Sequence, residues 1–467
     1  MEANALPTGD DAAQRLIDLN SCIEFLEKTG DLVHVSTEVD PDYELAGIAK
    51  KLEGGKCVLF ERVRGSEHAV FIGLLWNRDI VGRLFGAPGQ RVPFVIADAI
   101  GQWKRNKEAI PSPIVDNGPA NEIIEPEIDL FKLPVPIHAL EDGGKYFDSS
   151  VVMVKNPQTG VPNISIHRIM ISEKDRLTFL IDPGRHLGAY LAIAEAQGRP
   201  LEVTINNGVG LAPWLASVIA KQGDGKQGIA NHLAGRPIPL IKAQTVDVPA
   251  FSSAQFVIEA EILPGVREEE GPFAEVTGYY AERARRWVMR VKKITRRRNP
   301  IFHTLLSGTE VWNAVGFTAE AKIFSEVKGK VPQLRAVYLS PGGCGFYGAV
   351  VQVEKDSEDA GKEAIMAAFE AFEPLQRVVA VDTDVNIFDP IDVDWAVTTR
   401  FDADNDLIIL KNQPGHILNP MVRIDPGGKG GTVTKTGIDA TTPYPRTSQF
   451  KRVKFKEVDL GRYKIGQ

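Results

Sequence analysis

The first quarter of the chain alternates segments whose apolar residues follow helical spacing with segments that follow the alternating period of strands. Leu19, Cys22, Ile23 and Leu26, for example, share one face of a predicted helix. The expected elements are helices at 11–28 and 41–51 and strands at 32–39, 57–60 and 69–75. The stretch 110–136 then carries six prolines and little periodicity, which predicts a linker and a domain boundary near residue 125.

From Tyr146 the pattern changes to short β-branched runs, interrupted by one strong helical segment at 187–196. The strands expected there are 150–154, 163–170, 201–205, 256–262 and 287–294. Many short strands with few helices indicate a barrel-like β domain. After Gly308 helices and strands alternate again, which is typical of a second α/β unit. Its expected elements are helices at 318–328 and 361–372 and strands at 336–339, 349–353 and 378–382.

The predicted fold class is therefore a multi-domain α/β protein of α+β character. The expected domains are an α/β domain at 1–125, a β-barrel domain at 126–308 and an α/β domain at 309–467. The segment from Asn412 onward is rich in Gly, Pro and Thr, and we expect it to be functional loop rather than core.

Composition narrows the class of function. The 467 residues are 43% hydrophobic and 25% charged, as in ordinary globular proteins. A net charge of −7 argues against a general nucleic-acid binder, which needs a basic surface. The longest apolar stretch, 69–76, is too short to span a bilayer, and the first residues do not resemble a signal sequence. Three scattered cysteines favour neither a disulfide framework nor a thiolate metal site, so we expect a cytoplasmic protein.

The first candidate site is the predicted strand at 162–168, which reads Pro-Asn-Ile-Ser-Ile-His-Arg. Alternation along a strand places Asn163, Ser165 and His167 on one face. An amide, a hydroxyl and an imidazole in a row can hold a phosphate or a metal ion. A solvated sheet face explains the same pattern equally well.

The second candidate site is the segment 182–188, where a Pro-Gly turn leads into a predicted helix with Arg185 and His186 at its start. Free backbone N–H groups and the positive end of the helix dipole make such a start a natural anion site. A helix start with an incidental basic pair is an equally good interpretation.

The third candidate site is the stretch 269–279, which contains Glu270 and Glu275. On a regular strand these two side chains would point to opposite faces, but the Gly271-Pro272 break can bring both carboxylates to one cavity. Two carboxylates beside one arginine can hold one proton and pass it on. Taken alone, the stretch is better interpreted as a solvated acidic turn.

Taken together and in this order, the three segments resemble the UbiD family of decarboxylases, which use prenylated flavin mononucleotide. The resemblance extends from about Leu19 to Pro443. The motifs that carry it are Tyr146-Phe147-Asp148, the Asn-x-Ser-x-x-Arg strand, the Arg-His helix start, the Glu-Gly-Pro-Phe-x-Glu-x-Thr-Gly-Tyr stretch, Val378–Val385 and Gly437–Thr441.

The resemblance implies an N-terminal α/β domain, a central split β-barrel that binds the flavin, and a C-terminal α/β domain that contributes to oligomerisation. It implies that a divalent metal, usually manganese, bridges the flavin phosphate to the protein, with potassium nearby. Asn163 and His186 match the metal-ligand positions. The implied cofactor-binding residues are Asn163, Ile164, Ser165, Ile166, His167, Arg168, Arg185, His186 and Lys226.

The implied activity is reversible, non-oxidative decarboxylation of an aromatic, heteroaromatic or α,β-unsaturated carboxylic acid, with the prenylated flavin as covalent electron sink. Arg168, Glu270 and Glu275 match the catalytic network, with Glu275 in the proton-donor position. The segments that carry Trp312, Phe317 and Leu418 are expected to line the substrate pocket.

The expected partners are a small carboxylic acid, a flavin prenyltransferase that supplies the cofactor, and further copies of the chain in a homodimer or larger oligomer. Two alternatives are a non-catalytic flavin- or phosphate-binding protein and a conventional FMN oxidoreductase on the same scaffold. The intact set of Arg168, Glu270 and Glu275 argues against the non-catalytic alternative.

One position departs from the family pattern. Family members usually present a third metal ligand, a Glu, before a turn that leads into Gly-x-Pro, here Gly235-Arg236-Pro237. Lys226 takes that place, or Gly228 if the alignment shifts by two residues, and Asp224 is the nearby carboxylate. We therefore expect flavin binding that depends less on manganese, with Lys226 partly replacing the metal. The alternative is that Lys226 turns to solvent and the metal keeps two protein ligands and water.

Overall fold

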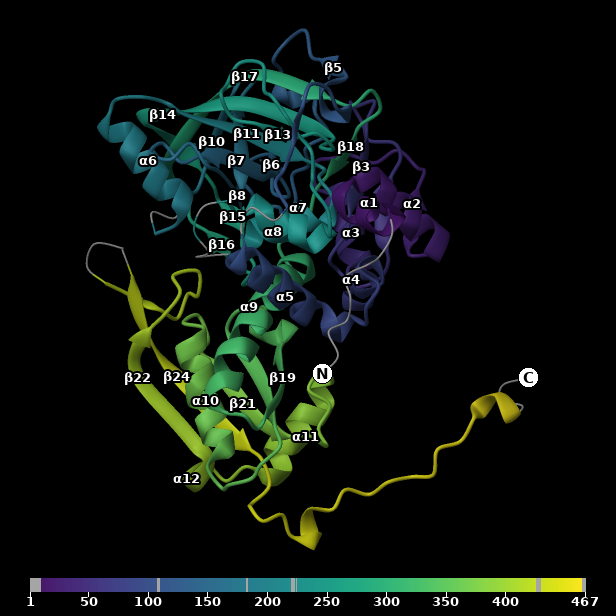
Figure 1. Cartoon of the computed structure of the whole chain (residues 1–467), viewed down its shortest axis with the longest axis vertical. Coiled ribbons are helices and arrows are strands. Elements are labelled where there is room, and N and C mark those ends of the chain that lie inside the picture. The colour runs from purple at the N-terminus through teal and green to yellow at the C-terminus, as the bar shows by residue number, and fades with distance from the viewer. Residues whose placement is uncertain are drawn as a thin grey trace.

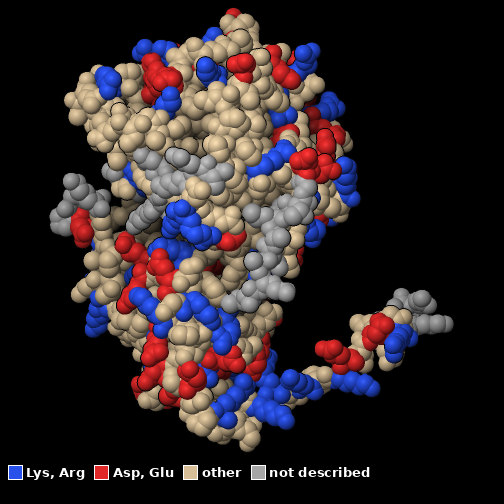
Figure 2. Space-filling view, in the orientation of Figure 1, with Lys and Arg blue, Asp and Glu red and all other residues tan. Residues whose placement is uncertain are grey.

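The computed structural model describes residues 10–106, 110–181, 184–219, 223, 225–425 and 430–463. Figure 1 shows the N-terminal part packed beside the central strands, the C-terminal sheet below them, and the last residues extending away from the body. Basic and acidic side chains are interspersed on the face drawn in Figure 2, as the small negative net charge leads one to expect. Among the described residues, no helix is both long and apolar enough to cross a membrane.

The N-terminal part follows the predicted alternation, except that one predicted helix is divided and the helices at 78–85 and 92–105 were not predicted. The predicted helix 11–28 is two helices, because Asp18 adopts extended backbone and its side chain accepts the N–H of Asn20 as the cap of the second helix. A four-stranded sheet has the order β1-β2-β3-β18, so residues from after the central strands complete it. The elements are α1 Asp10–Ile17, α2 Leu19–Thr29, β1 Leu32–Val35, α3 Glu44–Leu52, β2 Cys57–Phe60, β3 Ala69–Ile72, α4 Arg78–Phe85, α5 Val92–Arg105 and β18 Ile301–His303.

The central part is built on a large sheet with the order β6-β9-β10-β17-β14-β11-β7-β8, to which β5 adds beside β17. Its strands are β5 Ile123–Ile124, β6 Tyr146–Phe147, β7 Val151–Lys155, β8 Pro162–Ile166, β9 Ile169–Glu173, β10 Arg176–Phe179, β11 Leu201–Asn207, β14 Phe256–Glu270 and β17 Ala284–Arg296. Smaller strands are β4 Ile114–Val115, β12 Leu240–Ile241, β13 Ala250–Phe251, β15 Phe273–Ala274 and β16 Tyr280–Ala281. The helices are α6 His186–Ala196, α7 Leu211–Val218 and α8 Gln227–Ala234.

The predicted single strand 163–170 is wrong. The chain leaves β8 after Ile166 and enters β9 at Ile169, so His167 and Arg168 lie in a two-residue link rather than on a strand face. β8 is the edge strand at one end of the sheet, and β9 is the second strand from the other end. Because three residue steps span at most about 11 Å, this link holds the two ends of the sheet near each other. The order of the described strands nevertheless has two ends and does not close into a barrel.

The central sheet is covered on both faces. Along β7, Val151 and Met153 enter the hydrophobic core that includes α7, α8 and α1, while Val152 and Val154 enter a second core with α6. The first core contains residues from the N-terminal helices and from the start of α9 as well. The central strands are therefore anchored to both neighbouring parts of the chain.

The C-terminal part contains a six-stranded sheet with the order β19-β20-β21-β24-β22, and β23 pairs with β24. α9 and α10 cover one face and α11 the other. The elements are α9 Thr309–Lys330, β19 Leu334–Leu339, β20 Gly348–Val353, α10 Ala360–Ala371, β21 Arg377–Asp382, α11 Pro390–Arg400, α12 Ala403–Asp406, β22 Leu407–Pro414, β23 Arg423–Ile424 and β24 Gly431–Ala440. The expectation that the chain is loop from Asn412 onward is wrong for β24, which pairs with β21 and β22 on its two sides.

Candidate active site

Arg168 lies between two carboxylates that come from different strands. Its Nη2 is 3.0 Å from Oε2 of Glu270, the last residue of β14, and its Nη1 forms an ion pair with Oε1 of Glu275, which follows β15. The side chains are almost enclosed, with exposed fractions of 8% for Arg168, 0% for Glu270 and 13% for Glu275. One guanidinium therefore joins two carboxylates in a nearly dry site.

The Gly271-Pro272 break brings the two carboxylates together, so the interpretation of this stretch as a solvated acidic turn is wrong. Gly271 has a φ of +95°, in the left-handed region, and a Cβ there would lie 3.2 Å from the backbone of Glu282 and Arg283. β14 ends at Glu270, one residue before the turn, and the two-residue strand β15 begins directly after Pro272. The turn brings Glu275 to Nη1 of the guanidinium whose Nη2 contacts Glu270, despite their spacing in sequence.

Tyr146 and Phe273 hold this cluster in place. The Tyr146 hydroxyl donates to Oε1 of Glu270 at 3.0 Å, so both oxygens of that carboxylate have partners. The Phe273 ring lies 4.6 Å from the ring of Tyr146, and the guanidinium carbon of Arg168 lies 4.9 Å above it. Burial, together with the charge of Glu270, raises the pKa of Tyr146, so its hydroxyl stays a donor.

The carboxyl of Glu275 has the chemistry of a proton carrier. Burial raises its pKa above the ordinary value, against the opposing charge of Arg168. For Arg168, burial acts to lower the pKa, but the charges of Glu270 and Glu275 have the larger combined effect. The pKa of Arg168 is therefore raised overall. Arg168 therefore stays charged while Glu275 can take up and release a proton.

We expect Tyr146→Phe to lower the free energy of unfolding by about 1–3 kcal/mol, because it leaves one oxygen of a buried carboxylate without a donor. If the hydrogen bond from Tyr146 to Glu270 stabilises the transition state by about 1.4 kcal/mol, its loss would lower kcat about tenfold. Chemical denaturation and steady-state kinetics measure both effects. Tyr279→Phe is the matched control, because Tyr279 is 64% exposed. If Tyr146→Phe and Tyr279→Phe had the same stability and the same kcat, Tyr146 would have no role in the site.

A second polar cluster joins β8 to the starts of α6 and α8. Asn163 is buried, its Nδ2 donates to the Tyr190 hydroxyl at 3.4 Å, and its Oδ1 accepts the backbone N–H of Lys226 at 3.4 Å. The ring of His186, the first residue of α6, stacks on Tyr190 with 6.2 Å between centroids. Asn163, His186 and Lys226 are thus brought to one place, next to exposed Arg185. Asp182, Pro183 and Asp224 lie outside the described residues.

Lys226 is buried, with an exposed fraction of 4%, so the alternative that it turns to solvent is wrong. Its Nζ donates to the backbone carbonyls of Ser217 at 3.3 Å and Ile219 at 2.9 Å, at the end of α7. Burial, and to a smaller extent the charge of Arg185, lowers the pKa of Lys226 to about 7. The amino group, which is charged below that pKa, is therefore held inside the protein by neutral oxygens.

The other residues of the 162–168 segment divide into two apolar side chains that pack in the core and a polar pair, Ser165 and His167. Ile164 is buried in the first hydrophobic core and Ile166 packs against it. Since the Leu180 carbonyl can only accept, Nδ1 of His167 donates to it at 3.3 Å, and Nε2 lies 2.9 Å from the Ser165 hydroxyl. Both ring nitrogens of His167 are therefore in use.

The expected pocket residues have different positions. Trp312, near the start of α9, donates its indole N–H to the carbonyl of Val276 at 2.8 Å, one residue after Glu275. Leu418 lies half-buried in the segment between β22 and β23. Phe317 instead lies fully buried in the first core, with the guanidinium carbon of Arg78 4.3 Å from its ring centroid.

Sequence reasoning missed Tyr347, which the fold brings towards Glu275 from the C-terminal part. Its hydroxyl is buried and has no hydrogen-bond partner among the described residues. Burial, followed by the nearby Cys344 and the charge of Glu275, raises the pKa of Tyr347. Its ring centroid is 6.4 Å from that of His416. No sequence signal marks Tyr347, because its proximity to Glu275 arises only from packing between distant segments.

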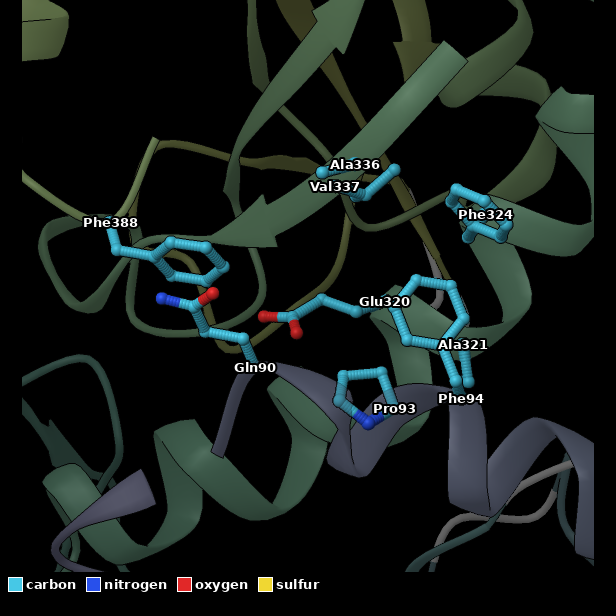
Figure 3. Close-up of a pocket in the computed structure, with 9 residues that line it drawn as sticks. All are labelled: Gln90, Pro93, Phe94, Glu320, Ala321, Phe324, Ala336, Val337 and Phe388. Atoms are coloured by element: carbon cyan, nitrogen blue, oxygen red, sulfur yellow. The ribbon is translucent and has the colours of Figure 1, made fainter. Parts of the chain in front are cut away.

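Figure 3 shows a separate small pocket between α5, α9 and β19. Its charged group, Glu320, is already bound: Nη2 of Arg78 lies 2.6 Å from one oxygen, and the other accepts the N–H of Leu339 at 3.0 Å. The pocket therefore lies where the N-terminal part packs against the C-terminal part, and the Arg78–Glu320 ion pair connects the two. Its lining residues are Gln90, Pro93, Phe94, Glu320, Ala321, Phe324, Ala336, Val337 and Phe388.

Comparison with known families decides what kind of protein carries this cluster. Sequence models of 3-octaprenyl-4-hydroxybenzoate carboxy-lyase match residues 23–100 as its N-terminal domain, 114–310 as its Rift-related domain and 313–440 as its C-terminal domain. The chain belongs to the UbiD family. It is accordingly a carboxy-lyase with three α/β domains, and the resemblance inferred from its motifs is confirmed.

Individual UbiD relatives match almost the whole chain. An uncharacterized protein in the cooM 5′ region of Rhodospirillum rubrum is 46% identical over 450 residues, 95% of this chain and 96% of that protein. Anhydromevalonate phosphate decarboxylase of Methanosarcina mazei is 35% identical over 429 residues, 91% of this chain and 96% of that protein.

Solved structures of a UbiD-class enzyme have the same fold. HmfF from Pelotomaculum thermopropionicum, in complex with FMN, has a TM-score of 0.89 and 38% identity, covering 96% of this chain and 100% of its own. An evolved dimeric form of HmfF, in complex with prFMN, has a TM-score of 0.84 and 37% identity, covering 94% and 97%. UbiD-class relatives of this chain therefore bind FMN and its prenylated form.

Proposed function

We propose that the chain is a reversible, non-oxidative decarboxylase of an aromatic, heteroaromatic or α,β-unsaturated carboxylic acid that uses prenylated FMN. The observation that carries this proposal is the Arg168 cluster, in which one enclosed guanidinium contacts both Glu270 and Glu275. The guanidinium can bind a substrate carboxylate, and the carboxyl of raised pKa can supply a proton. Removal of CO₂ from an unsaturated carbon needs both functions.

The residues beside Arg185 fit the phosphate of a flavin mononucleotide. A guanidinium at the start of α6 lies near the buried ammonium of Lys226, which has no carboxylate partner among the described residues. We propose that the flavin-binding residues are Asn163, Ile164, Ser165, Ile166, His167, Arg168, Arg185, His186 and Lys226. When bound, the prenylated flavin supplies an electron sink for the charge left on the carbon by departure of CO₂.

In this proposal Arg168 binds and orients the substrate carboxylate. Protonation of Glu275, which burial favours, frees Nη1 of Arg168, while Glu270 keeps Nη2 and the hydroxyl of Tyr146. The freed N–H donates to the incoming carboxylate. The enclosed site excludes water, which strengthens this charge-assisted bond.

Glu275 then returns its proton to the carbon that has lost CO₂. The transfer leaves Glu275 as a carboxylate beside Arg168, which stabilises it again as an ion pair. Proton transfer in the opposite direction, from product to Glu275, is the first step of carboxylation. The same three side chains therefore serve both directions, with Glu270 positioning Arg168 throughout.

The metal ions that the family implies do not fit the donors described here. The third-ligand position falls on Lys226, or on Gly228 if the alignment shifts by two residues, and neither an ammonium nor a glycine side chain can coordinate Mn²⁺. Oδ1 of Asn163 accepts the backbone N–H of Lys226. The described residues hold no group of three or more His, Cys, Asp or Glu side chains placed to bind a metal ion. No step of the proposed reaction therefore uses a metal.

The central strands, we propose, form a split barrel around the flavin at residues 126–308, between α/β domains at 1–125 and 309–467. The two-residue link from β8 to β9, which draws the ends of the sheet together, supports this arrangement. Trp312, Phe317 and Leu418 are proposed to line or support the substrate pocket. The contact of Trp312 with Val276, next to Glu275, is the observation that supports it.

We also propose a homodimer or larger homo-oligomer. The C-terminal residues extend away from the body (Figure 1) and expose Val453 at 80% and Phe455 at 90%. A second copy of the chain is the partner that would cover them. Light scattering of the purified full-length chain tests the proposal, and a mass of one chain at all concentrations would reject it.

The function is tested by incubating the purified protein with a panel of carboxylic acids and measuring CO₂. The protein is produced with and without co-expression of a flavin prenyltransferase. We expect CO₂ release only from the protein produced with it. Flavin binding without CO₂ release from any acid would support the non-catalytic alternative, and flavin-dependent oxidation would support a conventional FMN oxidoreductase.

A further inference from the structure

The feature that the proposed reaction does not explain is the buried ammonium of Lys226. Nζ donates to the carbonyl oxygens of Ser217 and Ile219, and within the described residues it makes no ion pair. A buried charge without a counter-charge is costly, because neutral carbonyls replace only part of the hydration that burial removes. Arg185 carries a second positive charge nearby. Because no described carboxylate pairs with Lys226, an anion bound within reach of Nζ would stabilise its charge.

The oxygens that hold Lys226 are of the kind that hold a potassium ion. Backbone carbonyls are the usual protein ligands of K⁺, and an ammonium group carries the same single charge. Because the charged Nζ lies 3.3 Å and 2.9 Å from the oxygens of Ser217 and Ile219, it would repel a potassium ion bound to the same oxygens. An ammonium has three N–H donors, and two are used in these bonds. The third is available to an anionic oxygen.

We propose that Lys226 is a built-in cation of the flavin-phosphate site and makes flavin binding by this chain independent of both divalent metal and potassium. The inference rests on the proposed flavin site and extends it. The ammonium replaces the charge of the metal ions, and Arg185 provides a second positive group for the phosphate dianion. The hydrogen bond from the backbone N–H of Lys226 to Asn163 holds the start of α8, and with it the ammonium of Lys226, against β8.

The test measures FMN affinity by fluorescence quenching with the full-length chain freed of flavin. Titrations are made in EDTA, in excess Mn²⁺, and with Na⁺ in place of K⁺, and the metal content of the flavin-loaded protein is measured. We expect dissociation constants that agree within about twofold in all conditions, and far less than one metal ion per chain. Stoichiometric Mn²⁺ with loss of FMN in EDTA, or binding that requires K⁺, would overturn the inference. Absence of FMN binding in every condition would instead reject the proposed flavin site.

Two variants of Lys226 and one control variant sharpen the test. Lys226→Met should weaken FMN binding at least about tenfold, because it removes the charge at nearly constant volume. Lys435→Met is the matched control, because Lys435 is also buried and donates to a carbonyl, that of Glu373, in the C-terminal part. Lys226→Glu should create Mn²⁺-dependent FMN binding that EDTA reverses. Unchanged affinity in folded Lys226→Met would contradict the inference, and the wild-type titrations decide it if that variant does not fold.

Discussion

Replacing Glu275 with glutamine is expected to lower the rate of decarboxylation by about 10²–10⁴-fold while flavin stays bound. The variant keeps the size of the side chain and a hydrogen-bond acceptor for Arg168, but it removes the transferable proton. Steady-state CO₂ release and the absorbance of bound flavin measure the two effects. Glu269→Gln is the matched control, because Glu269 is exposed and lies on β14, next to Glu270. A Glu275→Gln rate within about threefold of wild type would contradict the role.

The pH dependence of the wild type follows from the same proton. Glu275 must be protonated to act, and burial raises its pKa above the ordinary value. The rate should therefore be constant below that raised pKa and fall as pH rises through it, about tenfold per pH unit. A rate that instead rises with pH over this range would show that the ionised form is the active one.

Replacing Arg168 with lysine is expected to raise KM and lower kcat, with a combined loss of kcat/KM of about 10²-fold or more. The guanidinium contacts Glu270 with one arm and Glu275 with the other, and an ammonium cannot copy that planar fork. Lysine keeps the positive charge beside the fully buried Glu270, so the fold should survive. Loss of the charge in Arg168→Met should cost about 3–5 kcal/mol of stability.

Arg176→Lys is the control for Arg168→Lys. Arg176 pairs with Glu268 at 2.8 Å, but its side chain is 39% exposed, so the pair contributes little. We expect unchanged kinetics for this variant. If Arg168→Lys behaved in the same way, Arg168 would be a packing residue and the substrate carboxylate would bind elsewhere.

The sequence predicted the elements whose pattern is local. The helix expected at 187–196 is α6, and the strands expected at 57–60, 349–353 and 378–382 are present with small shifts at their ends. In these segments the apolar residues lie on the face of the helix or strand that is buried in the structure. The spacing of apolar residues is therefore sufficient to predict the element. The Gly271-Pro272 break was readable for the same reason, since both residues interrupt a strand wherever they occur.

Other features depend on packing that a linear pattern does not contain. Residues 163–170 read as one strand because no Gly or Pro marks the link at His167 and Arg168. β24 reads as loop because it is rich in Gly and Thr, yet it pairs with strands on both sides. The burial of Lys226 depends on where α7 ends relative to α8, which local spacing does not determine.

The most direct measurement is the isotope content of the product when wild-type protein, loaded with prenylated flavin, decarboxylates its best substrate in D₂O. We expect one deuterium at the carbon that carried the carboxylate, no consumption of O₂, and loss of both CO₂ release and deuterium incorporation in Glu275→Gln. Equal CO₂ release by protein that was never supplied with prenylated flavin, or an oxidised product formed with uptake of O₂, would contradict it.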